Sequence, residues 1–163
     1  MVSFLNSPGR RGIFGALMDE YARAADDFCR VAEGLTADGF EVVRPQNEPE
    51  TATPRAVCLH VVGAAYRYAY YIREALKLDF IDRFDADPAL LTQPSDTRAQ
   101  LAAAIRLTEE TVEPIWNFDD QQIQGVSFVV RWGPRYDPEM LIEHAVCHLL
   151  RHRRQLERWN LRA

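Results

Sequence analysis

Residues 137–159, DPEMLIEHAVCHLLRHRRQLERW, are the stretch of the chain that says most about its fold. They open with a capping aspartate, a proline and an acidic residue, which is a typical helix start. Apolar residues then recur at helical spacing along one stripe, so we expect a long amphipathic helix. His148 and His152 belong to this stripe. The pattern therefore predicts that both imidazoles face inward.

Outward from this helix, three earlier segments show the same helical periodicity. They span approximately residues 13–35, 53–76 and 95–114. The second opens with Thr53 and Pro54, a cap residue followed by a proline at the first helical position. Four such segments without a credible sheet predict an all-α fold. We expect an antiparallel four-helix bundle that takes up residues 1–163 as a single domain.

The connections between the expected helices are predicted to differ in secondary structure. Residues 44–54 are polar and rich in proline, which predicts an irregular segment. A short helix is expected within residues 79–91. Residues 126–132 alternate in polarity and end at a Gly-Pro pair, so they predict a strand, or half of a small β-hairpin, before the last helix.

Composition excludes several classes of function. Of the 163 residues, 47% are hydrophobic and 26% are charged, as in an ordinary globular domain. The net charge of −5 argues against nucleic acid as a partner. No apolar run approaches the ~18 residues of a membrane span, and the sequence opens without the apolar segment of a signal peptide. Three widely spaced cysteines without a CxxC pair indicate a reducing compartment, so we expect no membrane association and a cytoplasmic location.

Three histidines are candidate metal ligands. His148 and His152 stand four residues apart, so they share a helix face and can bind one ion from the same side. His60 lies on the apolar face of the helix expected over 53–76, from which it can supply a third nitrogen. The alternative is three core histidines satisfied by backbone carbonyls or water. We favour one divalent transition metal with an open coordination position. Neutral imidazoles suit zinc, nickel, copper or iron, and affinity order alone does not choose among them; zinc or nickel is expected foremost.

The neighbours of these histidines are less decisive. His144 stands about 80° around the helix from His152, so it flanks the pocket, hydrogen-bonds a ligand or packs in the core. Gln155 belongs to the inward stripe and is expected to flank the same pocket. Cys58 and Cys147 point away from the adjacent histidines and are expected to be core or flanking residues.

The spacing of the histidines resembles that of the DinB/YfiT-like superfamily. Its members share an up-down-down-up helix bundle with a three-histidine metal site. One ligand comes from the second helix and two come from a His-x-x-x-His-Arg-Gly-Gln motif on the last helix. The matching positions are His60, His148, His152, Arg153 and Gln155, and the glycine of the motif is Arg154 here. The resemblance covers nearly the whole chain in helix order and implies the same three metal ligands.

The resemblance also implies a metal-dependent enzyme that acts on a small-molecule substrate. The leading expectation is an S-transferase that activates a low-molecular-weight thiol such as bacillithiol, mycothiol or glutathione. The alternative is a hydrolase in which the metal activates water. No carboxylate stands in an obvious general-base position, so the catalytic residues stay unassigned. A non-catalytic helical bundle with a structural metal is the rival from a different class.

A homodimer is expected on two grounds. The first is the family resemblance. The second is the number of tyrosines on the helix expected over 53–76, which exceeds what one inward face can bury. These tyrosines are Tyr66, Tyr68, Tyr70 and Tyr71.

Overall fold

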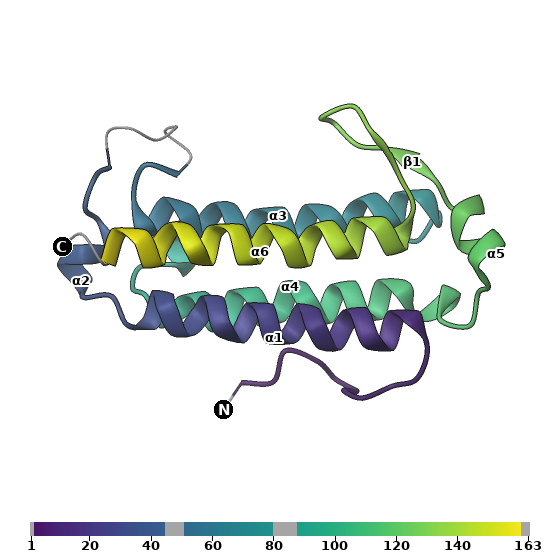
Figure 1. Cartoon of the computed structure of the whole chain (residues 1–163), viewed down its shortest axis with the longest axis horizontal. Helices are drawn as coiled ribbons and strands as arrows, with labels where there is room; N and C mark the ends of the chain where they lie inside the picture. The colour runs from purple at the N-terminus through teal and green to yellow at the C-terminus, as the bar shows by residue number, and fades with distance from the viewer. Residues whose placement is uncertain (1, 45–50, 80–87, 161–163) are drawn as a thin grey trace.

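The computed structural model describes residues 2–44, 51–79 and 88–160, and within these ranges the chain is mostly helical with one small antiparallel sheet (Figure 1). The long helices are α1 (Ile13–Glu33), α3 (Pro54–Ala75), α4 (Asp96–Val112) and α6 (Pro138–Asn160). The shorter elements are α2 (Ala37–Phe40), η2 (Pro88–Leu90), η3 (Glu113–Ile115), α5 (Asp120–Gly125), β1 (Phe128–Val129) and β2 (Arg135–Tyr136). Among the helices in these ranges, none combines the length and apolar character that a membrane crossing requires.

The four long helices lie side by side (Figure 1). Helix α1 packs on α4 and α6, and α3 packs on the same two helices. Arg98 at the start of α4 meets Glu33 at the end of α1, whereas Arg153 in the last part of α6 meets Asp27 in the last part of α1. Helix α1 thus runs antiparallel to α4 and parallel to α6. Figure 1 shows α3 running with α4 and against α6. The antiparallel arrangement that we expected therefore holds for two of these pairs, and the other two are parallel.

Helices α3 and α6, which carry the candidate histidines, each begin at a capping residue that the sequence predicts. The Thr53 hydroxyl accepts a hydrogen bond from the Ala56 amide at 3.0 Å, and the Asp137 carboxylate accepts one from the Met140 amide at 2.9 Å. A proline follows each cap as the first helical residue. Each cap satisfies an amide that has no partner within its own helix. Helices α3 and α6 therefore begin where the sequence predicts.

The segment before α6 forms the small hairpin, with strands shorter than the expected span of residues 126–132. Strands β1 and β2 pair with Phe128 opposite Tyr136, and each contains two residues. Between them Gly133 adopts a φ of 110°, a conformation that favours glycine over residues with side chains. The hairpin is confirmed, and the chain turns back earlier than the alternating pattern indicates.

The sequence does not predict α2 or α5. These helices have 4 and 6 residues, too few for a helical period to stand out. Within residues 79–91, where a short helix is expected, the structure describes a 3-10 turn at Pro88–Leu90. The rest of that expectation lies mostly in residues 80–87, outside the described ranges, as do residues 45–50 of the polar connection.

Two of the cysteines belong to the apolar core between the long helices. Cys29 and Cys58 are fully buried, and burial raises the pKa of each thiol to about 12. Neither is ionised at neutral pH, so neither is a reactive thiolate. Cys147 is exposed on α6. Cys58 is thus a core residue and Cys147 a flanking one, as their helical positions predict.

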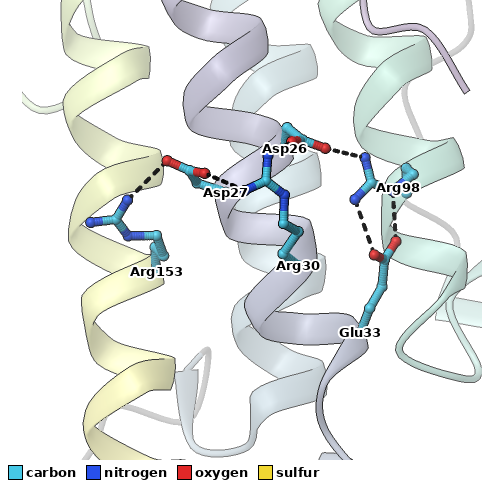
Figure 2. A network of polar contacts seen from close by, with 6 residues as sticks. All are labelled: Asp26, Asp27, Arg30, Glu33, Arg98 and Arg153. Atoms are coloured by element: carbon cyan, nitrogen blue, oxygen red, sulfur yellow. Dashed lines mark hydrogen bonds and ion pairs between the residues drawn. The ribbon is translucent and has the colours of Figure 1, made fainter. Parts of the chain in front are cut away.

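A chain of charged residues ties α1 to both of its neighbours (Figure 2). Arg98 of α4 donates to both carboxylate oxygens of Glu33, at 2.7 and 3.0 Å, and to Asp26 at 2.6 Å. The hydrogen bond from Arg98 is the largest cause that lowers the pKa of Asp26. On the other side, Arg153 of α6 reaches Asp27 at 3.2 Å. Arg98 is the best-shielded member, with 15% of its side chain exposed.

Replacing Arg98 with methionine is expected to lower the free energy of unfolding by about 1–2 kcal/mol. The change removes a two-pronged ion pair and leaves two carboxylates close together without their shared cation. Urea unfolding measures the effect. Arg23→Met is the matched control, because the pair that the described residues give Arg23 is with Glu20 on the same exposed helix face and should matter little. Equal destabilisation by the two variants would contradict the assignment.

Candidate metal centre

His60, His148 and His152 converge at the seam between α3 and α6. Their ligand nitrogens all lie within 4.8 Å of one another, close enough to hold one metal ion. The Nε2 atoms of His60 and His148 are 3.1 Å apart. The ring centroid of His152 lies 4.5 Å from that of His148 and 5.0 Å from that of His60. The structure thus brings together the three residues that the sequence singles out.

The apolar stripes of the two helices explain this convergence. On α6, Ala145, Leu149 and Leu156 are buried on the side that carries the histidines. On α3, Val57 and Val61 are buried around His60. Because both helices turn their apolar sides toward the protein interior, histidines within or beside these stripes are carried to the same seam. His152 is 6% exposed, whereas His60 and His148 are only partly buried.

Burial keeps the α6 histidines neutral. It lowers the pKa of His148 to about 3 and that of His152 to about 4, and the proximity of the other imidazoles acts in the same direction. A neutral imidazole has one nitrogen lone pair to offer, and this is the form that binds metals. At neutral pH these rings are therefore ready to act as ligands without first losing a proton.

Gln155 fixes the orientation of His152. Its Oε1 atom lies 2.8 Å from Nδ1 of His152. An amide oxygen only accepts, so Nδ1–H is the donor and the lone pair of the neutral ring is on Nε2. Outer hydrogen bonds of this kind hold metal-ligating histidines in the required tautomer. Gln155 was expected to flank the pocket, and the structure instead places it behind His152, as a positioning residue.

Replacing Gln155 with methionine should weaken zinc binding about tenfold to a hundredfold, because His152 loses the acceptor that fixes its tautomer. Competition against a chromophoric chelator measures the affinity. Gln155→Glu keeps an acceptor for Nδ1–H and should restore most of the binding. Arg154→Ala is the neighbouring control on the exposed side of α6. If Gln155→Met bound zinc like the unaltered protein, the positioning role would be wrong.

His144 lies outside the group of three and faces the cavity beside it. Its Nδ1 atom is 3.3 Å from the Tyr136 hydroxyl, and its ring stacks on Trp132 with centroids 5.3 Å apart. The ring centroids of His144 and His148 are 6.2 Å apart. Burial lowers the pKa of His144 as well. Of the three roles that the sequence leaves open, flanking the pocket is the one that fits.

A cavity of about 230 Å³ opens next to His60 and His148. Its other lining residues are Ala64, Arg67, Tyr68, Arg131, Trp132 and His144. Tyr68 is buried against the imidazoles, with ring centroids 5.5 Å from His144 and 5.8 Å from His148. Burial raises the pKa of Tyr68 to about 12, against the opposing charges of Arg67 and Arg131. The Tyr68 hydroxyl therefore keeps its proton at neutral pH.

Sequence reasoning missed four of these cavity residues. Arg67 and Tyr68 follow His60 by seven and eight positions, so they share its face of α3, and helical spacing could have revealed them. Arg131 and Trp132 belong to the hairpin, and only its fold brings them to the cavity. Among the residues that the structure describes, no carboxylate lines the cavity.

Comparisons of the chain with protein-family models, with curated proteins and with solved structures found no match.

Proposed function

We propose that His60, His148 and His152 bind one divalent transition metal, zinc or nickel, in an enzyme that transfers a low-molecular-weight thiol to a small electrophile. The observation that carries the proposal is the convergence of three imidazole nitrogens within 4.8 Å beside a cavity. Nitrogen donors without carboxylates suit metals of this type. Within the described ranges the group has three protein ligands and not four, which leaves a position for a reactant and favours a catalytic over a structural ion.

The competing interpretation is a direct hydrogen bond between His60 and His148 without a metal. Their Nε2 atoms, 3.1 Å apart, could share one proton in that case. His152 argues against this interpretation, because the contact with Gln155 uses its Nδ1–H and leaves the lone pair of Nε2 available in a ring beside the other two. A single proton shared by His60 and His148 has no use for a third lone pair. The lone pair of His152 instead completes a set of three nitrogen ligands for a cation.

A bound divalent ion would supply positive charge that lowers the pKa of a thiol and holds the resulting sulfur anion. The thiol sulfur then forms a bond to the electrophilic carbon, and a leaving group departs with the bonding electron pair and takes up the thiol proton. Tyr68 and His144 stand on the cavity side of the histidines. The Tyr68 hydroxyl can donate a hydrogen bond to the leaving group, and neutral His144 can hold the proton in transit.

The finer points of the fold belong to the same proposal. We infer a DinB/YfiT-like four-helix bundle, which is supported by α1 and α6 running one way and α3 and α4 the other. The homodimer stays a prediction from the resemblance, because the tyrosine argument is weaker than expected. Tyr66 is buried, and Tyr71 stacks on Phe128 of the hairpin at a centroid distance of 6.0 Å. Light scattering at micromolar concentration tests it, and a monomer mass would contradict it.

Thiol consumption tests the activity. Protein loaded with zinc or nickel is mixed with bacillithiol, mycothiol or glutathione and an activated aryl halide, and the rate is compared with that of His148→Ala. We expect conjugation that needs both the metal and one of the thiols. Hydrolysis of an activated ester without thiol would favour the hydrolase. If the protein binds a metal and neither reaction is accelerated, the ion is structural.

A further inference from the structure

The cavity beside the three histidines has a one-sided charge. Two of its lining residues, Arg67 and Arg131, carry guanidinium groups, and within the part of the chain that the structure describes no carboxylate lines it. A divalent cation held by imidazoles would add two further positive charges to this described lining. Its charge therefore favours an occupant that carries negative charge.

The two arginines reach the cavity from different elements. Arg67 follows His60 by seven residues on α3, and Arg131 lies in the hairpin, where its backbone amide donates to the Tyr71 hydroxyl at 2.9 Å. Arg67 and Arg131 line the same cavity, together with Tyr68. Each guanidinium has five N–H donors. Each can therefore hold a carboxylate and still keep a contact within the protein.

The remaining wall limits the size and shape of the occupant. Trp132 is 41% exposed and stacks on His144, which gives the cavity a flat aromatic side. The volume of about 230 Å³ lies below the range of typical drug-sized pockets. A compact molecule fits within it.

We propose that the cavity binds a small organic anion that carries two functional groups, a metal-binding donor such as a thiol and a carboxylate. The donor lies at His60, His148 and His152, and the carboxylate pairs with Arg67 and Arg131. This inference rests on the proposed metal site and names the class of its substrate. A planar guanidinium binds a carboxylate through two parallel hydrogen bonds, which gives direction as well as charge.

Two thiols that differ only in the distal group test the proposal. Protein loaded with Co²⁺ is titrated with 3-mercaptopropionate and with 3-mercaptopropan-1-ol, and the visible spectrum of the ion reports sulfur binding. We expect the carboxylate compound to bind about tenfold more tightly. Arg67→Met and Arg131→Met should each remove most of this preference and leave cobalt stoichiometry and binding of the alcohol unchanged. Equal affinities in the unaltered protein would overturn the proposal.

Arg151→Met is the matched control. Arg151 is exposed on α6 and its charge acts on His148 and His152, but it does not line the cavity. The variant loses one positive charge near the histidines and should keep the preference for the carboxylate. Loss of the preference here as well would mean that general charge, and not the two cavity arginines, selects the anion.

A metal-free measurement separates this inference from the metal site. Iodide and acrylamide quench exposed tryptophan, and the contribution of Trp132 is obtained by difference from Trp132→Phe. We expect Arg67→Met and Arg131→Met to lower quenching by the anion iodide about twofold and to leave quenching by neutral acrylamide unchanged. If cobalt fails to bind and the iodide effect holds, the metal proposal falls and the anion cavity stands. If iodide quenching is unchanged in both arginine variants, the proposed anion cavity is wrong, regardless of whether the protein binds a metal.

Discussion

Replacing His148 with alanine is expected to lower the affinity for zinc or nickel by on the order of a hundredfold to a thousandfold. The ring of His148 lies next to those of both His60 and His152, with centroids 5.1 and 4.5 Å away. Without it the remaining nitrogens come from separate helices and do not form an adjacent pair on one face. Metal per chain after dialysis against a weak chelator, together with calorimetric titration, measures the loss.

The other histidines define which set of residues is correct. His60→Ala and His152→Ala should reduce metal occupancy as His148→Ala does, because each removes one of three ligands. His144→Ala should retain most of the metal, because His144 lies outside the group and contacts Tyr136 and Trp132 instead. If His60→Ala keeps full occupancy, or His144→Ala loses it all, the assignment of ligands is wrong.

In the metal-free protein, the free energy of unfolding is expected to fall steeply as the pH is lowered from about 6.5 toward 4. Burial lowers the pKa of His148 to about 3 and of His152 to about 4, whereas both titrate near 6.5 in the unfolded chain. Between the folded and the unfolded pKa values, His148 and His152 are protonated in the unfolded chain but not in the folded one. Each histidine then costs about 1.4 kcal/mol of stability per pH unit. Above about pH 7.5 both states bind almost no protons at these rings, and the effect vanishes.

Urea unfolding midpoints between pH 7.5 and 5 measure this dependence, in a range where most carboxylates stay ionised. The double variant His148→Gln, His152→Gln lacks both titrating rings and should show a much flatter profile. Parallel profiles for the variant and the unaltered protein would show that these imidazoles are not held neutral by the fold. A loss of a few kcal/mol is a large part of the 5–15 kcal/mol that typically stabilises a domain.

The helices could be predicted closely because their signals are local. A cap and a proline open α3 and α6, and apolar periodicity extends over four or more turns. The hairpin could be predicted only in part. The alternation over residues 126–132 suits one longer strand equally well, and the turn depends on Gly133 taking a positive φ.

The candidate metal site could likewise be predicted from the sequence only in part. The spacing of His148 and His152 fixes their common face through helix geometry alone. The placement of His60 against them depends on how α3 and α6 pack, a contact across 88 positions of sequence that the resemblance implied and periodicity could not determine. The place of Arg131 and Trp132 in the cavity could not be predicted from the sequence, because it depends on how the chain folds back between α5 and α6.

The anchoring of the hairpin has a consequence for the entropy of binding. Strands of two residues are not stable by themselves in water. This hairpin is held from both sides, by Tyr71 of α3 through the Arg131 amide and by His144 of α6 through Tyr136 and Trp132. Its backbone is therefore ordered before any ligand arrives, and the conformational freedom of that segment is lost during folding, not during association. Preorganisation of this kind lets even a compact ligand with few atoms reach a useful affinity.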